Sequence, residues 1–132
     1  FINARIKNHK RIYDGLKDFE NLLILPKAQK NSIPSWFGFL ITIKDVCEIT
    51  RNEIVIKLEE KQIQTRLLFA GNIIRHPVFN KMRESNSGYR VIGELKNTDK
   101  VMNDSFWLGV YPGMSDEMIN YMINQISEIL KK

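Results

Sequence analysis

The chain has 132 residues, of which 43% are hydrophobic and 27% are charged, and this balance suits one soluble domain with its own core. No apolar run approaches the roughly 20 residues that a membrane helix requires, and the single cysteine, Cys47, excludes an internal disulfide. A lone cysteine indicates a reducing compartment such as the cytoplasm, where it is expected to pack as a small apolar side chain.

The net charge of +5 is modest and is spread along the chain. Proteins that bind nucleic acid more often gather their basic residues into a stripe with exposed aromatic residues. We therefore expect a solvated basic surface and no nucleic-acid partner, with a free-standing basic binding module as an open alternative. The basic residues include Lys7, Lys10, Arg11, Lys17, Arg66, Arg75, Arg90, Lys131 and Lys132.

The first 25 residues predict one helix, because apolar side chains recur at intervals of four, three and four. Gly15 weakens this helix without having to break it, and Pro26 marks its end. Since the chain begins with Phe1 rather than Met, we expect an excised fragment in which residues 1–25 lead in from a preceding domain. The apolar face of the helix consists of Ile12, Leu16, Phe19 and Leu23.

Three later segments are rich in aromatic and β-branched residues and predict strands, namely residues 36–43, 63–69 and 105–110. Between the first two strands, Thr50 and Glu53 have the spacing of a capping box and begin a short helix.

The chain after Asn72 is expected to be irregular, with one short helix that begins at Pro77 and another that is capped by Asn97 or Thr98. Ser115 is expected to cap the last helix. The apolar face of that helix is Ile119, Met122, Ile123, Ile126 and Leu130.

Together these elements predict a single α/β domain of two layers (α+β), in which about three mainly antiparallel strands bury one face against helices. Four aromatic residues are expected on the other face, where a partner domain would cover them. These residues are Trp36, Phe37, Trp107 and Tyr111.

Polar side chains gather at the end of the second predicted strand. Residues 65–72 end in a Gly-Asn turn, and two side chains that can carry a positive charge, Arg75 and His76, follow it. Such groups at a strand end suit the binding of an anion. The candidates are Arg66, Asn72, Arg75 and His76.

Each candidate also has a structural interpretation. Arg66 could clamp a phosphate or a sugar hydroxyl, or could form a surface ion pair with Glu59 or Glu60. Asn72 could contact substrate or only serve the turn, since Asn tolerates left-handed backbone. Arg75 and His76 could approach a pyrophosphate, or could form an exposed basic turn.

Three aromatic residues are candidates for a substrate pocket. Phe69 could wall a sugar pocket, and Trp36 and Phe37 could line a cleft, although strand aromatics commonly belong to the core. No zinc spacing, Walker loop, dinucleotide-binding turn or nucleophile elbow is present. His76 has no second ligand at a suitable spacing, so no metal site is expected.

Much of the chain resembles the C-terminal lobe of the CDP-4-keto-6-deoxyglucose 3-dehydratase group, within the DegT-type sugar aminotransferase superfamily. The resemblance implies the small domain of the pyridoxal-phosphate-dependent aspartate-aminotransferase fold. Where ordinary sugar aminotransferases typically carry a histidine-tyrosine pair, this chain has Leu68 and Phe69, which favours dehydration over transamination. The similar segments are residues 5–16, 34–39, 63–72, 97–99 and 106–113.

The resemblance further implies an enzyme of 3,6-dideoxyhexose and lipopolysaccharide biosynthesis. Such an enzyme is usually a homodimer that holds pyridoxamine phosphate noncovalently, with a histidine in place of the usual lysine. An iron–sulfur flavin reductase is the implied partner. Neither His9 nor His76 lies in a segment that matches that histidine, so the chain alone is expected to be inactive. A true aminotransferase lobe of the same fold stays open.

Overall fold

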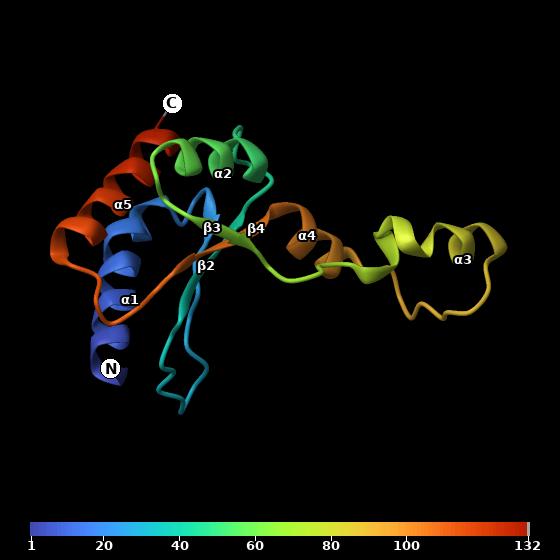
Figure 1. The fold of residues 1–132 in the computed structure, drawn as a ribbon, viewed down its shortest axis with the longest axis horizontal. Helices are drawn as coiled ribbons and strands as arrows, with labels where there is room; N and C mark the ends of the chain where they lie inside the picture. The colour runs from blue at the N-terminus through green and yellow to red at the C-terminus, as the bar shows by residue number, and fades with distance from the viewer. Residues whose placement is uncertain (132) are drawn as a thin grey trace.

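Four strands form one antiparallel sheet in the computed structural model, which describes residues 1–131; Lys132 lies outside the described residues. The order in the sheet is β1-β2-β4-β3, and every pairing is antiparallel (Figure 1). The predicted α/β class and antiparallel pairing are confirmed, with one strand more than the three predicted. The strands are β1 (Leu23–Ile24), β2 (Gly38–Ile43), β3 (Thr65–Leu67) and β4 (Ser105–Gly109).

Three helices pack on one face of this sheet, α1 (Ile2–Leu16), α2 (Arg51–Glu60) and α5 (Asp116–Leu130). Helix α1 approaches α5 closely at Gly15, where an added Cβ would lie 2.6 Å from Cδ1 of Ile123. The glycine in the last turn of α1 is therefore explained by helix packing. The core between helices and sheet includes Ile12, Leu16, Phe39, Ile41, Ile54, Leu58, Phe106, Leu108, Ile119 and Ile126.

The strand register separates the two faces of the sheet. Phe39, Leu108 and Thr65 pair in one row that faces the helices, and all three are buried. Because side chains alternate along a strand, the neighbouring row of Leu40, Trp107 and Arg66 points to the opposite face. We call this side the open face.

The predicted helix over residues 1–25 is wrong in its second half. Helix α1 ends at Leu16, a 3₁₀ turn covers Lys17–Phe19, and the chain then enters β1. Leu23 is 1% exposed and pairs with Ile43 in the sheet. The apolar spacing continues to Leu23 because helix α1 and strand β1 both place apolar side chains in the same core, although their backbone conformations differ.

Two predicted helix starts are confirmed. Thr50 and Glu53 form the capping box of α2, and the Ser115 hydroxyl accepts a hydrogen bond from the Met118 amide. On the last helix, Ile129 is buried, whereas the predicted face residue Leu130 is only partly buried.

The predicted cap at Asn97 or Thr98 is wrong. Helix α4 (Lys96–Asp104) begins earlier, and its N-cap is Leu95, which has a left-handed backbone and cannot cap through its apolar side chain. The strands are also shorter than predicted, since β2 begins at Gly38 and β3 covers only Thr65–Leu67.

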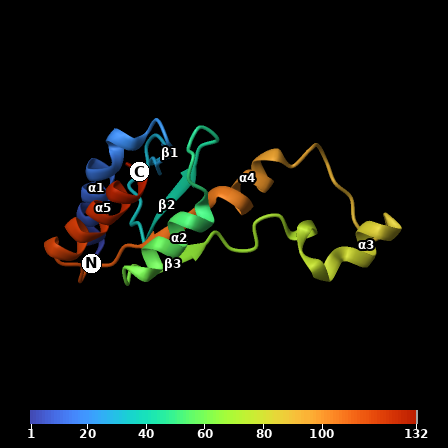
Figure 2. The ribbon, with the colours of Figure 1, turned by 90° about the horizontal axis from the view of Figure 1, so that it is seen from above.

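A projecting segment lies between β3 and α4, and we call its residues 73–95 the arm. It contains two 3₁₀ turns, Ile73–Arg75 and Pro77–Phe79, and helix α3 (Asn80–Ser85), in agreement with the short helix predicted from Pro77. The arm extends away from the body of the domain in both ribbon views (Figures 1 and 2). Within residues 1–131, no helix has the length and apolar character to cross a bilayer.

The single cysteine, Cys47, is partly buried and packs against the hydrophobic core.

His9 is an ionisable group at the edge of the core. It is 6% exposed, and its ring stacks on Trp36 with centroids 4.3 Å apart. The Phe39 ring lies 4.8 Å away on a tilt. This apolar surrounding disfavours the charged imidazole, and burial lowers the pKa of His9 from 6.5 to about 4.

The stability of the chain is expected to fall as pH decreases from 6.5 toward 4. In this window the unfolded chain takes up a proton at His9 that the folded chain does not, and the full loss amounts to about 3 kcal/mol. Urea unfolding between pH 5 and 6.5 should show this slope, and His9→Phe should flatten it. His76→Gln, which alters the other histidine, should retain the slope; a slope unchanged in His9→Phe would contradict the assignment.

Candidate functional site

The chain leaves β3 through a turn that has two residues with positive φ. Phe69 has φ 48° and is 82% exposed, and Gly71 has φ 59°. A bulky side chain in the left-handed region is strained, and such strain persists where surrounding contacts enforce it. The turn thereby holds an aromatic ring out from the body at the rim of the open face.

Asp99 on α4 braces this turn from the other side. Its Oδ1 accepts a hydrogen bond of 2.6 Å from Nδ2 of Asn72, which is 2% exposed. Its two oxygens also receive Nε and Nη2 of Arg75 at 3.3 and 3.0 Å. The Arg75 hydrogen bonds, followed by the one from Asn72, lower the pKa of Asp99, and Asp99 raises the pKa of Arg75.

His76 and Arg83 fasten the first part of the arm to the same turn. Nε2 of His76 lies 2.6 Å from the carbonyl oxygen of Ala70. The Arg83 guanidinium donates to the carbonyls of His76, at 3.0 Å, and of Ile74. These contacts tie residues 70–76 into one braced unit.

Arg66, in contrast, has no acidic partner among the described residues. Its guanidinium donates only to the carbonyl of the neighbouring Thr65, at 3.4 Å. The ion pair with Glu59 considered above is not formed, because Oε1 of Glu59 accepts the Thr65 amide at 2.7 Å and the Thr65 hydroxyl at 2.8 Å. Those hydrogen bonds, first the one from the backbone, lower the pKa of Glu59. Arg66 is therefore free to bind an anion.

An apolar hollow of about 310 Å³ lies on the open face and is bordered by Trp107, the strand partner of Arg66. Phe37 meets Trp107 edge to face with ring centroids 5.3 Å apart. The predicted residues Trp36, Phe37 and Phe69 all line this hollow. Because Phe37 contacts Trp107, it lies on the open face as predicted. The remaining lining includes Leu40, Leu68 and Trp107.

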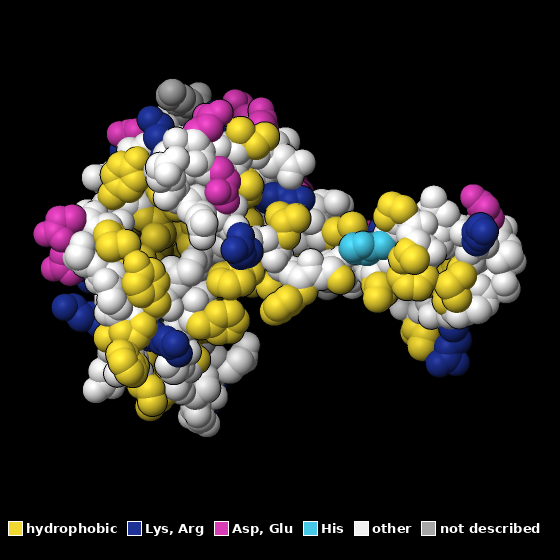
Figure 3. Space-filling view, in the orientation of Figure 1, with side chains coloured by type: hydrophobic (Ala, Val, Ile, Leu, Met, Phe, Trp, Pro, Cys, Tyr) yellow, Lys and Arg dark blue, Asp and Glu magenta, His cyan; other side chains and the backbone are white. Residues whose placement is uncertain are grey.

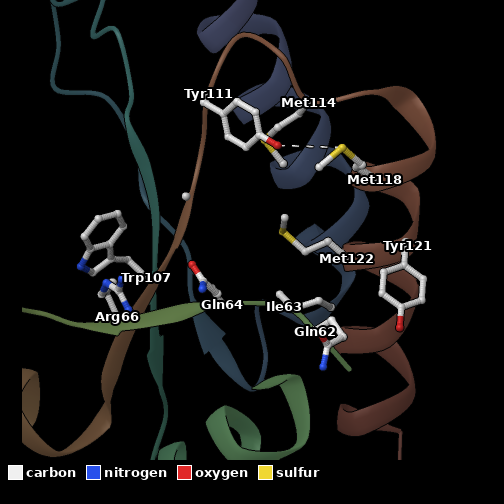
Figure 4. Close-up of a pocket in the computed structure, with 11 residues that line it drawn as sticks. Gln62, Ile63, Gln64, Arg66, Trp107, Tyr111, Met114, Met118, Tyr121 and Met122 are labelled. Atoms are coloured by element: carbon white, nitrogen blue, oxygen red, sulfur yellow. Dashed lines mark hydrogen bonds between the residues drawn. The ribbon is translucent and has the colours of Figure 1, made fainter. Parts of the chain in front are cut away.

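A second groove of about 600 Å³ lies between the end of β4 and helix α5. Figure 4 shows Arg66 and Trp107 on one side of this groove, with methionine and tyrosine side chains of α5 and the preceding loop opposite them. The Tyr111 hydroxyl lies 3.9 Å from Sδ of Met118. Tyr111 therefore borders the groove, and Trp107 lines both hollows.

The structure divides the predicted site residues into two groups. Trp36, Phe37 and Phe69 meet around one hollow, and Arg66 lines the neighbouring groove that shares Trp107 with it. The polar atoms of Asn72, Arg75 and His76 are engaged within the chain. Substrate contact by the second group stays a prediction.

Sequence analysis did not identify the role of Asp99, which holds both Asn72 and Arg75. No local signal connects Asp99 to Asn72, which lies 27 residues earlier.

The described residues alone do not fit pyridoxal phosphate. The hollow is lined by apolar side chains, no lysine borders it, and Arg66 is the one charged side chain in the central row of the open face. We assign no step of cofactor chemistry to them. Within residues 1–131, no three histidine, cysteine or acidic residues gather as metal ligands.

Replacing Asn72 by alanine is expected to destabilise the chain by about 1.5–3 kcal/mol, because it removes a buried hydrogen bond to a carboxylate. Arg75→Gln is the matched control, since it removes an exposed contact to the same carboxylate and should cost less. Urea unfolding measures both. An equal or larger loss for Arg75→Gln would contradict the bracing role of Asn72.

Comparison with known proteins gives concordant results. The sequence profile of the DegT/DnrJ/EryC1/StrS aminotransferase family matches residues 1–127. The chain is 45% identical over 128 residues to the lipopolysaccharide biosynthesis protein RfbH of Salmonella typhimurium. It is 46% identical over 132 residues to the dTDP-4-dehydro-2,6-dideoxy-D-glucose 3-dehydratase of Saccharopolyspora spinosa.

These alignments cover 97% and 100% of the chain but only 28% and 27% of the relatives. The chain thus spans less than a third of their length.

Solved structures share the fold. The GDP-4-keto-6-deoxy-D-mannose-3-dehydratase of E. coli, with bound hydrated PLP, superposes with a TM-score of 0.76 at 25% identity. The superposition covers 96% of this chain and 31% of that one. An aminotransferase from Psychrobacter cryohalolentis superposes with a TM-score of 0.81 at 16% identity, over 99% of this chain and 34% of the other.

Proposed function

This chain belongs to the DegT/DnrJ/EryC1/StrS aminotransferase family, and we propose that it forms the C-terminal lobe of a nucleotide-sugar 3-dehydratase. The observation that carries the proposal is the 46% identity, over the full chain, to a protein named as a 3-dehydratase of a nucleotide-linked deoxysugar. The similarity to a lipopolysaccharide biosynthesis protein supports a role in O-antigen deoxysugar synthesis.

The substrate we propose is CDP-4-keto-6-deoxyglucose, which loses its C3 hydroxyl on the way to a 3,6-dideoxyhexose. Pyridoxamine phosphate, held mainly by the remainder of the longer enzyme, would supply an electron sink for this elimination. The complete enzyme would act as a homodimer in the cytoplasm, with an iron–sulfur flavin reductase as the electron donor. The chain alone would be inactive.

In this proposal the open face is the substrate side of the lobe. Arg66 binds a phosphate or sugar hydroxyl through its unpaired guanidinium, and Phe69, Trp36 and Phe37 wall the hollow and exclude water. Asn72, Arg75 and His76 hold the turn of residues 70–76 in place, and this turn positions Phe69 on the substrate side. The polar contacts of Asp99 and Ala70 support this division of roles.

The test is turnover by the complete gene product that carries this chain. The protein is incubated with pyridoxamine phosphate, CDP-4-keto-6-deoxyglucose and a reduced iron–sulfur flavin reductase as the electron donor, and mass spectrometry follows loss of the C3 hydroxyl from the sugar. The dTDP- and GDP-linked sugars serve as matched substrates, because relatives are named for these nucleotides. An intact C3 hydroxyl with all three substrates would refute the proposal.

A sugar aminotransferase is the second candidate, because the matching family is named for aminotransferases and solved aminotransferases share the fold. Leu68 and Phe69 stand where such enzymes typically carry a histidine-tyrosine pair, which favours the dehydratase. Borohydride reduction of the complete gene product separates the two: an aminotransferase would retain the cofactor on a lysine, whereas the dehydratase would release it on denaturation.

A further inference from the structure

Helix α4 connects the arm to the body of the domain. It lies in the narrow connection between the two in the ribbon and space-filling views (Figures 1 and 3). None of its nine residues is buried, so apolar packing does little to fix its direction. The helix runs into β4 without a loop, because Asp104 ends α4 and Ser105 begins β4. The angle at this junction therefore depends on polar contacts.

Arg51, at the start of α2, bonds to both sides of the junction between α4 and β4. Its Nη2 donates to the carbonyl oxygen of Met102, on the helix side, at 3.3 Å. Its Nη1 donates to the carbonyl oxygen of Ser105, on the strand side, at 3.5 Å. The Ser105 hydroxyl lies 2.7 Å from the hydroxyl of Thr42 on β2, which fixes the strand side in the sheet. One planar guanidinium thus spans the junction with two donors.

The buried charge of Arg51 also suits the end of α4. The last carbonyls of a helix have no partner within it, and their partial negative charge favours a nearby cation. Helix α4 has no basic residue in its last turn, so Arg51 supplies this cation from a neighbouring helix. The side chain is 9% exposed, and the contact is therefore shielded from solvent and salt.

The direction of α4 decides where the turn of residues 70–76 lies. The Asp99 carboxylate on α4 holds this turn through the hydrogen bonds described above. Met102, one helical turn further along, packs against Gly71, where an added Cβ would lie 2.9 Å from Cα of Met102. A rotation of α4 about its junction with β4 would therefore displace both contacts together. Phe69, which precedes the turn, would move with it.

We propose that Arg51 is a positioning residue, which holds the turn and Phe69 in place on the substrate side by fixing the angle between α4 and β4. This inference rests on the proposed function, in which Phe69 walls the sugar hollow. Arg51 lines neither the hollow nor the groove, so it acts only through α4. Its Nε is buried without a partner, and apolar replacement of a buried charge is often neutral for stability. Position explains an arginine here better than stability does.

Hydrogen–deuterium exchange of the complete gene product, without substrate, tests the link from Arg51 to the turn. Arg51→Met removes the donors and keeps an unbranched side chain. Ile54→Val shortens a buried side chain on the same helix and leaves the junction intact, so it is the matched control. Amides of residues 69–76 are hydrogen-bonded within the turn. Their exchange should be about 3- to 30-fold faster in Arg51→Met and unchanged in Ile54→Val.

A double-mutant cycle on substrate binding tests whether Arg51 acts through Phe69. Arg51→Met should raise KM for the nucleotide sugar about 3- to 30-fold, with a smaller change in kcat because Arg51 contacts no reacting group. In a Phe69→Ala enzyme, which already lacks the ring, the same substitution should change KM by less than about twofold. Ile54→Val should leave KM unchanged.

Unchanged exchange of residues 69–76 in Arg51→Met would overturn the proposal, and so would additive effects of Arg51→Met and Phe69→Ala on KM. Equally fast exchange in Ile54→Val would overturn it too, because Arg51 would then serve only stability. Arg51→Lys keeps the charge without the paired donors; it should also speed exchange, and it decides the matter where Arg51→Met does not fold. The exchange measurement needs no turnover, so it tests Arg51 even where the turnover assay refutes the dehydratase.

Discussion

Replacement of Gly71 by alanine is expected to lower the free energy of unfolding by about 2–4 kcal/mol, because two penalties combine. Gly71 has φ 59°, a conformation that alanine adopts at a cost. The added Cβ would also lie 2.6 Å from Cβ and 2.9 Å from Cα of Met102. The Cα belongs to the backbone of α4 and cannot be relieved by a side-chain rotation. Urea unfolding of the 132-residue chain measures the loss.

Gly93→Ala is the matched control for this experiment. Gly93 also has a positive φ, 75°, but an added Cβ there would meet nothing within 4 Å. It should therefore show only the conformational penalty, about 1–2 kcal/mol. Equal losses for the two variants would mean that the turn does not pack against α4 as tightly as the structure indicates. In the complete enzyme, Gly71→Ala should also reduce turnover, since the same turn positions Phe69.

Replacement of Arg66 by glutamine is expected to reduce kcat/KM of the complete enzyme by about 10- to 100-fold. In the proposed site the lost group would be a charged donor to substrate, and hydrogen bonds to charged groups contribute about 1.5–3 kcal/mol. Because Arg66 has no acidic partner among the described residues, the substitution leaves no protein charge uncompensated. Steady-state kinetics on the nucleotide sugar measures the change, and Arg66→Lys should recover part of it if charge matters more than paired donors.

Arg11→Gln serves as the control for Arg66. Its guanidinium contacts Asp116 and Asn120 on the helical side of the domain, so kcat/KM should stay unchanged. An Arg66→Gln enzyme with the kinetics of the parent would remove Arg66 from the substrate site.

The elements that sequence predicted well have local causes. The Thr50 and Glu53 capping box and the Ser115 cap are contacts within one helical turn, and their residue types indicate them directly. The strand of residues 105–110 combined aromatic and β-branched residues and is found as β4. The placement of Trp107 on the open face followed from the need to bury only one side of such a sheet.

The features that sequence did not predict depend on distant contacts. Strand β1 exists because Leu23 and Ile24 pair with residues 42–43, although their spacing continues the pattern of α1. The bracing of Asn72 by Asp99 joins residues on two separate elements. The preference of asparagine for turns correctly predicts that Asn72 serves the turn. The Asp99 carboxylate that binds its side chain is found only in the folded structure.

The division of the site residues also changes how the turn is interpreted. The sequence grouped Arg66, Asn72, Arg75 and His76 as one set of anion-binding candidates. In the structure three of them fasten the turn and the arm, and Arg66 alone keeps a guanidinium without an acidic partner, in the groove that shares Trp107 with the aromatic hollow. The same residues thus support the open face and the root of the arm.

Hydrogen–deuterium exchange of the complete gene product, with and without its nucleotide sugar, most directly tests whether the open face receives the substrate. The expected result is slower exchange at the amides of residues 66–73 when substrate is present, with little change at the outer side of α2. Unchanged exchange in residues 66–73, while substrate protects other parts of the protein, would contradict the assignment of this face.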